Sequence, residues 1–199
     1  MKSLFALPFV ALVLATAAPA QQAAVPAPSI NAPAQIAADA NNRFTVELSS
    51  GGSVVILLRP DLAPNHVERI RTLARQGFYN GTTFHRVIPG FMAQGGDPQG
   101  TGEGGSTLPD LKAEFSAIPH LRGTVAMARA QSPDSANSQF YIMFGPKVSL
   151  DNKYTVIGRV ISGMDAADKI APGEPPAAPT KIVRASIGAP TSQQASTTP

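Results

Sequence analysis

The segment from residue 84 to 98, FHRVIPGFMAQGGDP, combines one strong cation with soft apolar groups and contains no obvious nucleophile. Arg86 precedes a Pro-Gly turn, and the turn is followed by two apolar side chains and one side-chain amide, those of Phe91, Met92 and Gln94. A fixed cation and an amide beside an apolar surface suit a reaction that changes the shape of a bound group without making or breaking covalent bonds.

Rotation about the peptide bond that precedes a proline is a reaction of this kind. Its barrier is about 18–20 kcal/mol because amide resonance must be lost. Twisting localises the lone pair on the prolyl nitrogen, so a guanidinium aimed at that nitrogen would bind the twisted state better than the planar one. Because alternate residues of a strand face the same side, we expect Phe84 and Arg86 to share a face and His85 to point away from it.

Other catalytic patterns have little support in the sequence. The histidines His66, His85 and His120 are scattered and lack metal-ligand spacing, so we expect the first and last at the surface and His85 in a structural hydrogen bond. No G-x-S-x-G motif is present, and the absence of cysteine excludes disulfides, thiolate catalysis and cysteine-ligated metal. The G-x-G-x-x-G that begins at Gly100 neither follows a predicted strand nor opens a helix, which predicts a loop. We expect no metal and no cofactor.

The charge pattern argues against a nucleic-acid partner. The chain carries a net charge of +3, but only 15% of its residues are charged. A nucleic-acid binder usually concentrates lysine and arginine in runs, and the sequence contains none.

The two ends of the chain differ from its middle. Residues 1–20 have a lysine, an apolar run and an Ala-Pro-Ala motif, which is the layout of a cleavable signal peptide, with an uncleaved anchor as the alternative. We therefore expect export to the periplasm, or alternatively secretion, and no membrane contact after cleavage. Residues 21–40, rich in Ala, Pro and Gln, predict a flexible linker, and residues 190–199 predict a disordered tail. The folded domain is expected at residues 41–189.

The elements that must position the candidate residues are mostly short strands. A hairpin is predicted from Phe44 to Leu58, and a helix from Pro64 to the Gly77 stop. Further strands are expected in the segments TTFHRVI, GTVAMA, SQFYIMF, YTVIGRVI and KIVRASI, with a second short helix in GMDAADKIA. A glycine-rich segment from Gly95 to Ser106 has no predicted strand. The pattern indicates a mainly β, mostly antiparallel fold, and it does not separate a closed barrel from a sandwich.

Four segments of the chain carry a family resemblance. FHRVIPGFMAQGGDP, GTGEGGS, GTVAMARA and NSQFYI occur in the order and spacing of the cyclophilins, the cyclosporin-binding peptidyl-prolyl isomerases, and the chain resembles that family from about Phe44 to Ile187. The resemblance implies a closed eight-stranded antiparallel β-barrel capped by two α-helices. It also implies a peptidyl-prolyl cis-trans isomerase that forms no covalent intermediate. As a bacterial exported member, it would act on proline-containing peptides and on unfolded or exported proteins, and we expect a monomer.

The resemblance also implies the site, position by position. Arg86 matches the catalytic arginine of the family. Phe91 and Met92 match the floor of the proline pocket. The full set of matched substrate-binding positions is Phe91, Met92, Gln94, Ala128, Arg129, Ala130, Gln139, Tyr141, Leu150 and Tyr154.

At four positions the sequence departs from the usual family pattern. Arg129 stands where asparagine is common, Tyr141 where phenylalanine is common, Ser149 where tryptophan is common and Tyr154 where histidine is common. The hydroxyl of Tyr141 must find a partner or water. The loss of the tryptophan puts cyclosporin sensitivity in doubt, while the proline pocket stays intact in outline.

A non-catalytic module or chaperone that holds proline-containing peptides is the alternative function. Such a binder has no need of a cation that acts only in the transition state, so the presence of Arg86 beside Phe91, Met92 and Gln94 favours the enzyme.

Overall fold

Eight β-strands form one sheet in the computed structural model, which describes residues 29–188. The elements are α1 (Ala34–Ala38), η1 (Ala40–Asn42), β1 (Arg43–Leu48), β2 (Ser53–Leu58), α2 (Pro64–Arg75), β3 (Thr83–Ile88), β4 (Met92–Asp97), β5 (Thr124–Met127), β6 (Phe140–Met143), η2 (Val148–Leu150), β7 (Val156–Ser162), α3 (Met164–Ala167) and β8 (Ile182–Ile187). The predicted signal peptide and C-terminal tail lie outside the described residues.

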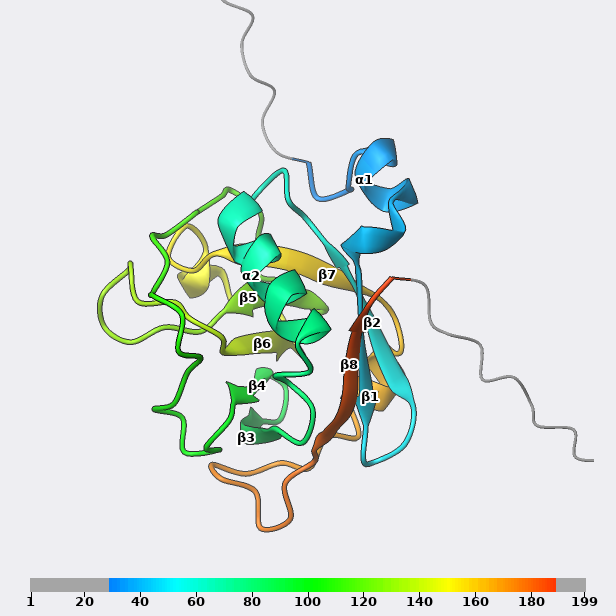
Figure 1. The fold of residues 1–199 in the computed structure, drawn as a ribbon, viewed down its shortest axis with the longest axis vertical. Helices are drawn as coiled ribbons and strands as arrows, with labels where there is room; N and C mark the ends of the chain where they lie inside the picture. Colours follow the sequence, from blue (N-terminus) through cyan, green and yellow to red (C-terminus); the bar gives the residue numbers. More distant parts are fainter. Residues whose placement is uncertain (1–28, 189–199) are drawn as a thin grey trace, which may run out of the picture.

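The sheet closes almost completely on itself. Its strand order is β3-β4-β6-β5-β7-β2-β1-β8, and every paired neighbour is antiparallel (Figure 1). The two ends of this order meet where the Phe84 amide donates to Thr180 O at 3.0 Å and the Ile182 amide donates to Thr82 O at 2.8 Å. The mainly β, eight-stranded antiparallel barrel that the family resemblance implied is therefore confirmed.

Aromatic side chains fill the middle of the barrel. Phe44, Tyr79, Phe84 and Phe140 are fully buried, and their rings meet edge-on or tilted at centroid distances of 5.7–6.3 Å. The predicted hairpin supplies the first of them, because β1 pairs with β2 and Phe44 lies opposite Ile56. Burial alternates along β2, and β1 buries Phe44, Val46 and Leu48 on the same core face, as the sequence pattern indicates, although Thr45 is buried as well.

Two helices cover the sheet at the positions predicted from the sequence. In α2, Pro64 occupies the first turn, and the apolar face of Val67, Ile70 and Leu73 packs toward β8. The short α3 packs against β2 through buried alanines. Gly77 ends the α2 region with φ of +72°, a conformation that glycine adopts without strain.

His66, predicted at the surface, is instead fully buried, so that prediction is wrong. Helix α2 has no side-chain cap of its own, and Glu114 supplies one from a distant loop by accepting the Asn65 and His66 amides at 3.2 and 3.1 Å. The same carboxylate lies 2.6 Å from His66 Nδ1. Burial lowers the pKa of His66 in spite of this partner, so the ring is neutral and donates its Nδ1 proton.

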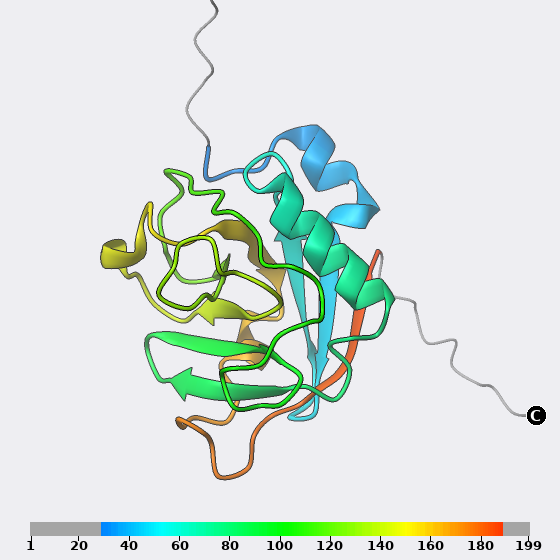
Figure 2. The same cartoon turned by 60° about the vertical axis from the view of Figure 1, so that its left-hand side comes forward.

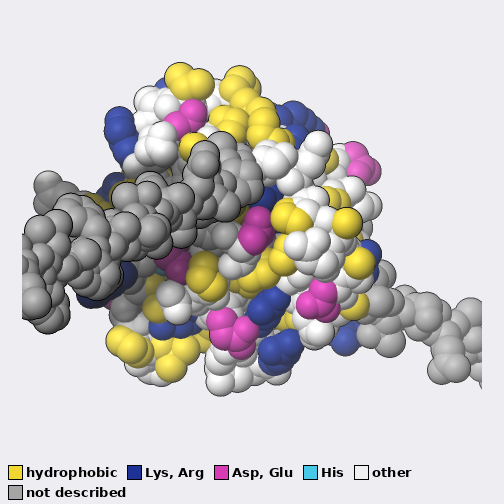
Figure 3. All heavy atoms as spheres, turned by 90° about the horizontal axis from the view of Figure 1, so that it is seen from above, with side chains coloured by type: hydrophobic (Ala, Val, Ile, Leu, Met, Phe, Trp, Pro, Cys, Tyr) yellow, Lys and Arg dark blue, Asp and Glu magenta, His cyan; other side chains and the backbone are white. Residues whose placement is uncertain are grey.

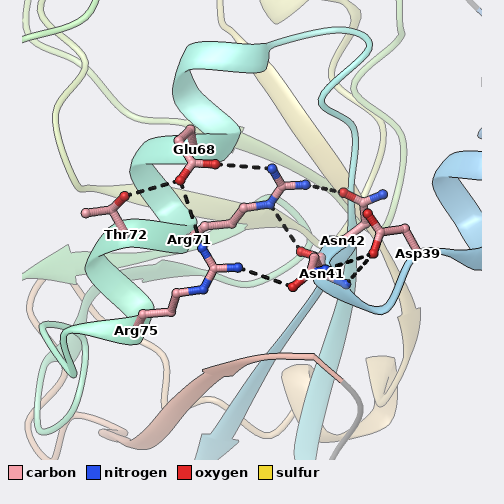
Figure 4. A network of polar contacts seen from close by, with 7 residues as sticks. All are labelled: Asp39, Asn41, Asn42, Glu68, Arg71, Thr72 and Arg75. Carbon is pink, nitrogen blue, oxygen red and sulfur yellow. Dashed lines mark hydrogen bonds and ion pairs between the residues drawn. The ribbon is translucent and has the colours of Figure 1, made fainter.

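The segment before β1 differs from the predicted flexible linker over residues 29–40. Arg59 donates to Ser29 O at 3.1 Å and to Ile30 O at 3.3 Å, and α1 and η1 follow. Figure 4 shows how a polar network then joins η1 to α2: Arg71 contacts Glu68 and Asn42, and its Nε donates to Asn41 O at 3.1 Å. These polar contacts fix residues 29–42 against the domain. The segment has too few apolar side chains for its sequence to predict this structure.

On the face seen in Figure 3, basic and acidic side chains lie interspersed among uncharged ones where the described atoms are visible. Within residues 29–188, no helix has the length and apolar character needed to cross a membrane.

Candidate active site

A β-bulge in β3 sets the direction of Arg86. Phe84 lies opposite Gly95, and Arg86 lies opposite Gln94, the next residue of β4. His85 is therefore an extra residue of β3 with no partner in β4. Phe84 points into the barrel core, whereas Arg86 is partly exposed on the outside. The prediction that these two side chains share a face is therefore wrong, because the bulge breaks the strict alternation.

Strand β4 is missing from the sequence-based expectation. Its second half contains Gly95 and Gly96, and glycine is poor in strands. Close packing requires both: a Cβ at Gly95 would lie 3.1 Å from the Phe84 ring, and one at Gly96 would lie 2.7 Å from Ser138 O. The same glycines that argue against a strand in the sequence therefore allow β4 to pack between β3 and β6.

One row across the sheet carries the polar part of the site. Arg86 of β3 pairs with Gln94 of β4, Gln94 pairs with Tyr141 of β6, and Tyr141 pairs with Ala126 of β5. Residues paired in this way present their side chains to the same face of a sheet. The register therefore places the cation, the amide and the aromatic ring side by side on the outer surface of the barrel.

A cavity of about 160 Å³ opens over this row. It is lined by Arg86, Phe91, Met92, Gln94, Ala128, Arg129, Tyr141, Leu150 and Tyr154, all of which are among the predicted site residues. Met92 and Tyr141 are buried beneath it, and Phe91 and Leu150 pack against the same cluster. The described lining residues include no carboxylate, histidine, serine or cysteine, and burial raises the pKa of the Tyr141 phenol, so the cavity offers apolar contact and hydrogen bonds and no activated nucleophile.

The two remaining predicted residues, Ala130 and Gln139, line a second cavity of about 470 Å³. It shares Gln94, Ala128 and Arg129 with the first, so the two cavities adjoin. The structure thus brings all eleven predicted residues together in one continuous surface. Figure 2 shows the β3–β4 hairpin beside the long irregular segments that border these cavities.

The glycine-rich segment is a loop, as expected, and it holds the glutamines in place. Gln94 Nε2 donates to Gln139 Oε1 at 2.8 Å, and Gln139 Nε2 donates to Gly102 O at 2.9 Å and Gly104 O at 2.8 Å. The loop is bound in turn by Asp97, whose carboxylate accepts the Gly102 amide at 2.7 Å and the Gln99 amide at 2.8 Å.

Asp97 is a structural residue of the site that sequence reasoning missed. Burial opposes ionisation of its carboxyl group, but the backbone N–H donors of the loop outweigh that effect and hold its pKa below the usual range. The only hint in the sequence is that Asp97 lies within a glycine-rich stretch, whose backbone N–H groups can turn toward one carboxylate.

The hydroxyl of Tyr141 finds its partner in His120. His120 was predicted at the surface and is instead buried, with Nε2 3.1 Å from the Tyr141 hydroxyl and Nδ1 3.0 Å from Asp151 Oδ1. Burial lowers the pKa of His120 in spite of Asp151, so the ring is neutral. Its Nδ1–H donates to Asp151, which leaves Nε2 to accept the Tyr141 proton. The hydroxyl therefore belongs to a buried network, and the Tyr141 ring borders the cavity.

His85 is also buried, but the structural hydrogen bond expected for it is not seen. Neither ring nitrogen has a hydrogen-bond partner among the described residues. Burial lowers its pKa, partly offset by nearby Asp97. The ring lies beside Gly102, where it fills the space under the loop.

Aromatic and cationic side chains form one wall of the first cavity. The rings of Tyr141 and Tyr154 meet nearly perpendicular at 5.8 Å. Arg129 lies over the Tyr154 ring at 4.5 Å and donates to Lys153 O at 3.0 Å. Arg129, in place of the usual asparagine, therefore braces the wall with its side chain.

Among residues 29–188, no group of three or more potential ligands is arranged to hold a metal ion.

Comparison with known proteins agrees with the fold and the cavity. The family model for cyclophilin-type peptidyl-prolyl cis-trans isomerases matches residues 43–187. A probable peptidyl-prolyl cis-trans isomerase from Brucella suis is 52% identical over 171 residues, covering 78% of this chain and 87% of that protein. Peptidyl-prolyl cis-trans isomerase B from Bacillus subtilis is 42% identical over 129 residues, covering 64% of this chain and 89% of that protein.

Solved structures give the same result. A cyclophilin from Hirschia baltica superposes with a TM-score of 0.69 at 33% identity, covering 75% of this chain and 74% of that one. A cyclophilin-type isomerase from Cryptosporidium parvum, solved in the presence of the dipeptide Ala-Pro, superposes with a TM-score of 0.68 at 26% identity, covering 73% of this chain and 98% of that one.

The chain belongs to the cyclophilin-type peptidyl-prolyl cis-trans isomerase family. Its enzymatic class follows: it is an isomerase that interconverts the cis and trans forms of the peptide bond before proline.

Proposed function

We propose that a proline ring binds in the cavity over the Arg86–Gln94–Tyr141 row and that Arg86 stabilises the twisted peptide bond. The observation that carries this proposal is the sheet register, which sets the Arg86 guanidinium and the Gln94 amide beside the apolar side chains of the cavity. The solved relative crystallised with Ala-Pro supports an X-Pro peptide as the ligand class.

The apolar residues of the cavity would bind the ring equally in both states of the bond. Met92 lies at the floor, and Phe91 and Leu150 pack around it, so the pyrrolidine ring gains contact area that twisting leaves unchanged. Holding the ring still while the preceding carbonyl turns confines the rotation to one bond.

Arg86 would contribute only when the bond is twisted. In the planar amide the nitrogen lone pair is delocalised, and in the twisted amide it becomes an acceptor for the guanidinium. An interaction made mainly in the twisted state lowers the barrier, because it stabilises the transition state more than the bound substrate. No bond to the protein forms at any step.

The adjoining cavity would receive the residues that precede the proline. Ala128, Arg129 and Ala130 form its border, and Gln139 is fixed there by the glycine-rich loop. An extended peptide can therefore run from the second cavity into the first across Gln94, which both share.

We further propose that the mature protein is a periplasmic monomer that assists the folding of exported proteins, with the isomerase domain at residues 41–189. The support is in the sequence: the layout of residues 1–20 is that of a cleavable signal peptide. An isomerase in that compartment would act on proline bonds of chains that fold after export, a step slow enough to limit folding without a catalyst.

A protease-coupled assay on a short Ala-Pro peptide tests the enzymatic proposal directly. We expect the protein to accelerate the slow cis-to-trans phase in proportion to its concentration. Binding of the same peptide without acceleration would instead identify a holding module and contradict the proposal.

A further inference from the structure

Arg86 has a charged partner outside the cavity. Its Nε donates to Glu174 Oε2 at 2.6 Å, although the two residues lie 88 positions apart in the chain. The side chains are 41% and 50% exposed. Glu174 does not line either of the two cavities, and it contacts the Nε of Arg86, so the two Nη groups stay available to the cavity.

The backbone fixes Glu174 beside Arg86. The segment between α3 and β8, drawn in orange, runs next to β3 in both ribbon views (Figures 1 and 2). There Gly173 and Val87 exchange two backbone hydrogen bonds of 2.8 and 2.9 Å and form an antiparallel bridge. Gly173 has φ of +142°, and a Cβ there would lie 2.6 Å from Pro176 Cα. The bridge joins the residues directly adjacent to Arg86 and Glu174, so it brings their side chains together.

We propose that Glu174 is a positioning residue for Arg86, an inference that rests on the proposed role of Arg86 in catalysis. Because the Glu174 carboxylate accepts a hydrogen bond from the Nε–H, rotation about the terminal side-chain bonds of Arg86 is restricted. This would leave its two Nη groups for the cavity that Arg86 lines, since neither Nη has a hydrogen-bond partner among the described residues. Among the described residues, Arg86 has no other hydrogen bond that could hold it in this orientation. A donor that is already oriented before the bond twists costs no reorganisation during the reaction.

The chain offers a matched control for this contact. Arg122 and Asp168 form an ion pair of 2.6 Å with side chains 47% and 44% exposed, and Asp168 lies in the same segment before β8. Exposed pairs of this kind contribute little to stability. Replacing either acid should therefore leave the fold intact, and only Glu174 should affect the reaction.

The test compares Glu174→Ala, Glu174→Gln and Asp168→Ala in the full mature protein. The rate constant of isomerisation of a bound Ala-Pro peptide is measured by NMR exchange, and the dissociation constant is measured separately. For Glu174→Ala we expect the rate constant to fall about twofold to tenfold with little change in affinity. Glu174→Gln should lose less, because its amide oxygen can still accept the Nε–H, and Asp168→Ala should match the wild type.

A double-mutant cycle decides whether Glu174 acts through Arg86. In the Arg86→Ala background, Glu174→Ala should cause no further loss, because there is no guanidinium left to orient. An equal loss in both backgrounds, an unchanged or faster Glu174→Ala enzyme, or a loss confined to affinity would each overturn the proposal. Failure of the proposed function looks different: Arg86→Ala alone would then be fully active.

Discussion

At the scale of single residues, the cavity depends on side chains that do not line it: His120 accepts a hydrogen bond from the Tyr141 hydroxyl, Asp97 binds the glycine-rich loop, and Glu174 contacts Arg86. Residue types pointed to Arg86, Phe91, Met92 and Gln94, and the family resemblance supplied the other predicted lining residues. His120 and Glu174 lie in distant loops and Asp97 ends β4, and nothing in the local sequence shows which groups these side chains contact. The β3 bulge could not be predicted either. The sequence pattern predicts a strict alternation of side chains along a strand, whereas a bulge depends on the register with the partner strand.

The Tyr141–His120 hydrogen bond leads to a prediction about stability. Tyr141→Phe should leave His120 Nε2 buried without a partner and lower the free energy of unfolding by about 1–3 kcal/mol. Tyr154→Phe is the control, because no hydrogen bond joins the Tyr154 hydroxyl to a described residue, and it should cost much less. Urea unfolding of both variants makes the comparison. Equal costs would show that the His120 contact contributes nothing specific.

At the scale of secondary-structure elements, the hairpin and α2 were predictable because local signals determine them: alternating apolar residues, a Gly-Gly turn and a proline in the first helical turn. Strand β4 was not predictable. Its glycines oppose strand formation locally, and only the close approach of β3 and β6 explains them. The segment at 29–40 was missed for the opposite reason, because polar contacts to Arg59 and Arg71 order it without an apolar pattern.

Gly96 provides the test of this account of β4. Gly96→Ala should cost about 1–2 kcal/mol for its positive φ and about 1–3 kcal/mol more for overlap with Ser138 O. Gly81→Ala is the control: its φ of +82° is close to the +86° of Gly96, but nothing lies within 4 Å of a Cβ there. Chemical denaturation should show the larger loss for Gly96→Ala. A larger loss at Gly81 would mean that close packing does not explain the glycine of β4.

At the scale of the whole molecule, the stability of the protein should depend on pH through its buried histidines. Burial lowers the folded-state pKa of His66, His85 and His120 below the ordinary value of 6.5. Such a group binds fewer protons in the folded than in the unfolded state, so stability is complete above about pH 6.5 and declines as the pH falls through the folded pKa. The carboxyl groups of Asp97 and Glu114, whose pKa values are also lowered, extend the decline below about pH 4.

Urea unfolding between pH 8 and pH 5 measures this dependence. The free energy of unfolding should be level at the upper end and fall toward pH 5, with a slope of at most about 1.4 kcal/mol per pH unit for each histidine. His66→Gln should reduce the slope relative to the wild type. A flat profile across this range would show that the histidines are not held neutral in the folded state.

The processing of the chain is a second prediction at this scale. The apolar run and the Ala-Pro-Ala motif before Gln21 predict cleavage after Ala20. Intact-mass analysis of protein from the periplasmic fraction should give a chain that begins at Gln21. Full-length protein with Met1, recovered in soluble form from the cytoplasm, would contradict both export and the proposed periplasmic role.

The most direct test of the central claim compares Arg86→Ala with the wild type in two measurements on one X-Pro peptide. If the guanidinium stabilises the twisted bond, the isomerisation rate constant of the bound peptide should fall by about tenfold to a few hundredfold. The dissociation constant should change much less, because Met92, Phe91 and Gln139 still hold the peptide. Arg86→Lys should restore little of the rate, since an ammonium lacks the planar fork of the guanidinium. A fully active alanine variant, or equal losses of rate and affinity, would contradict the account.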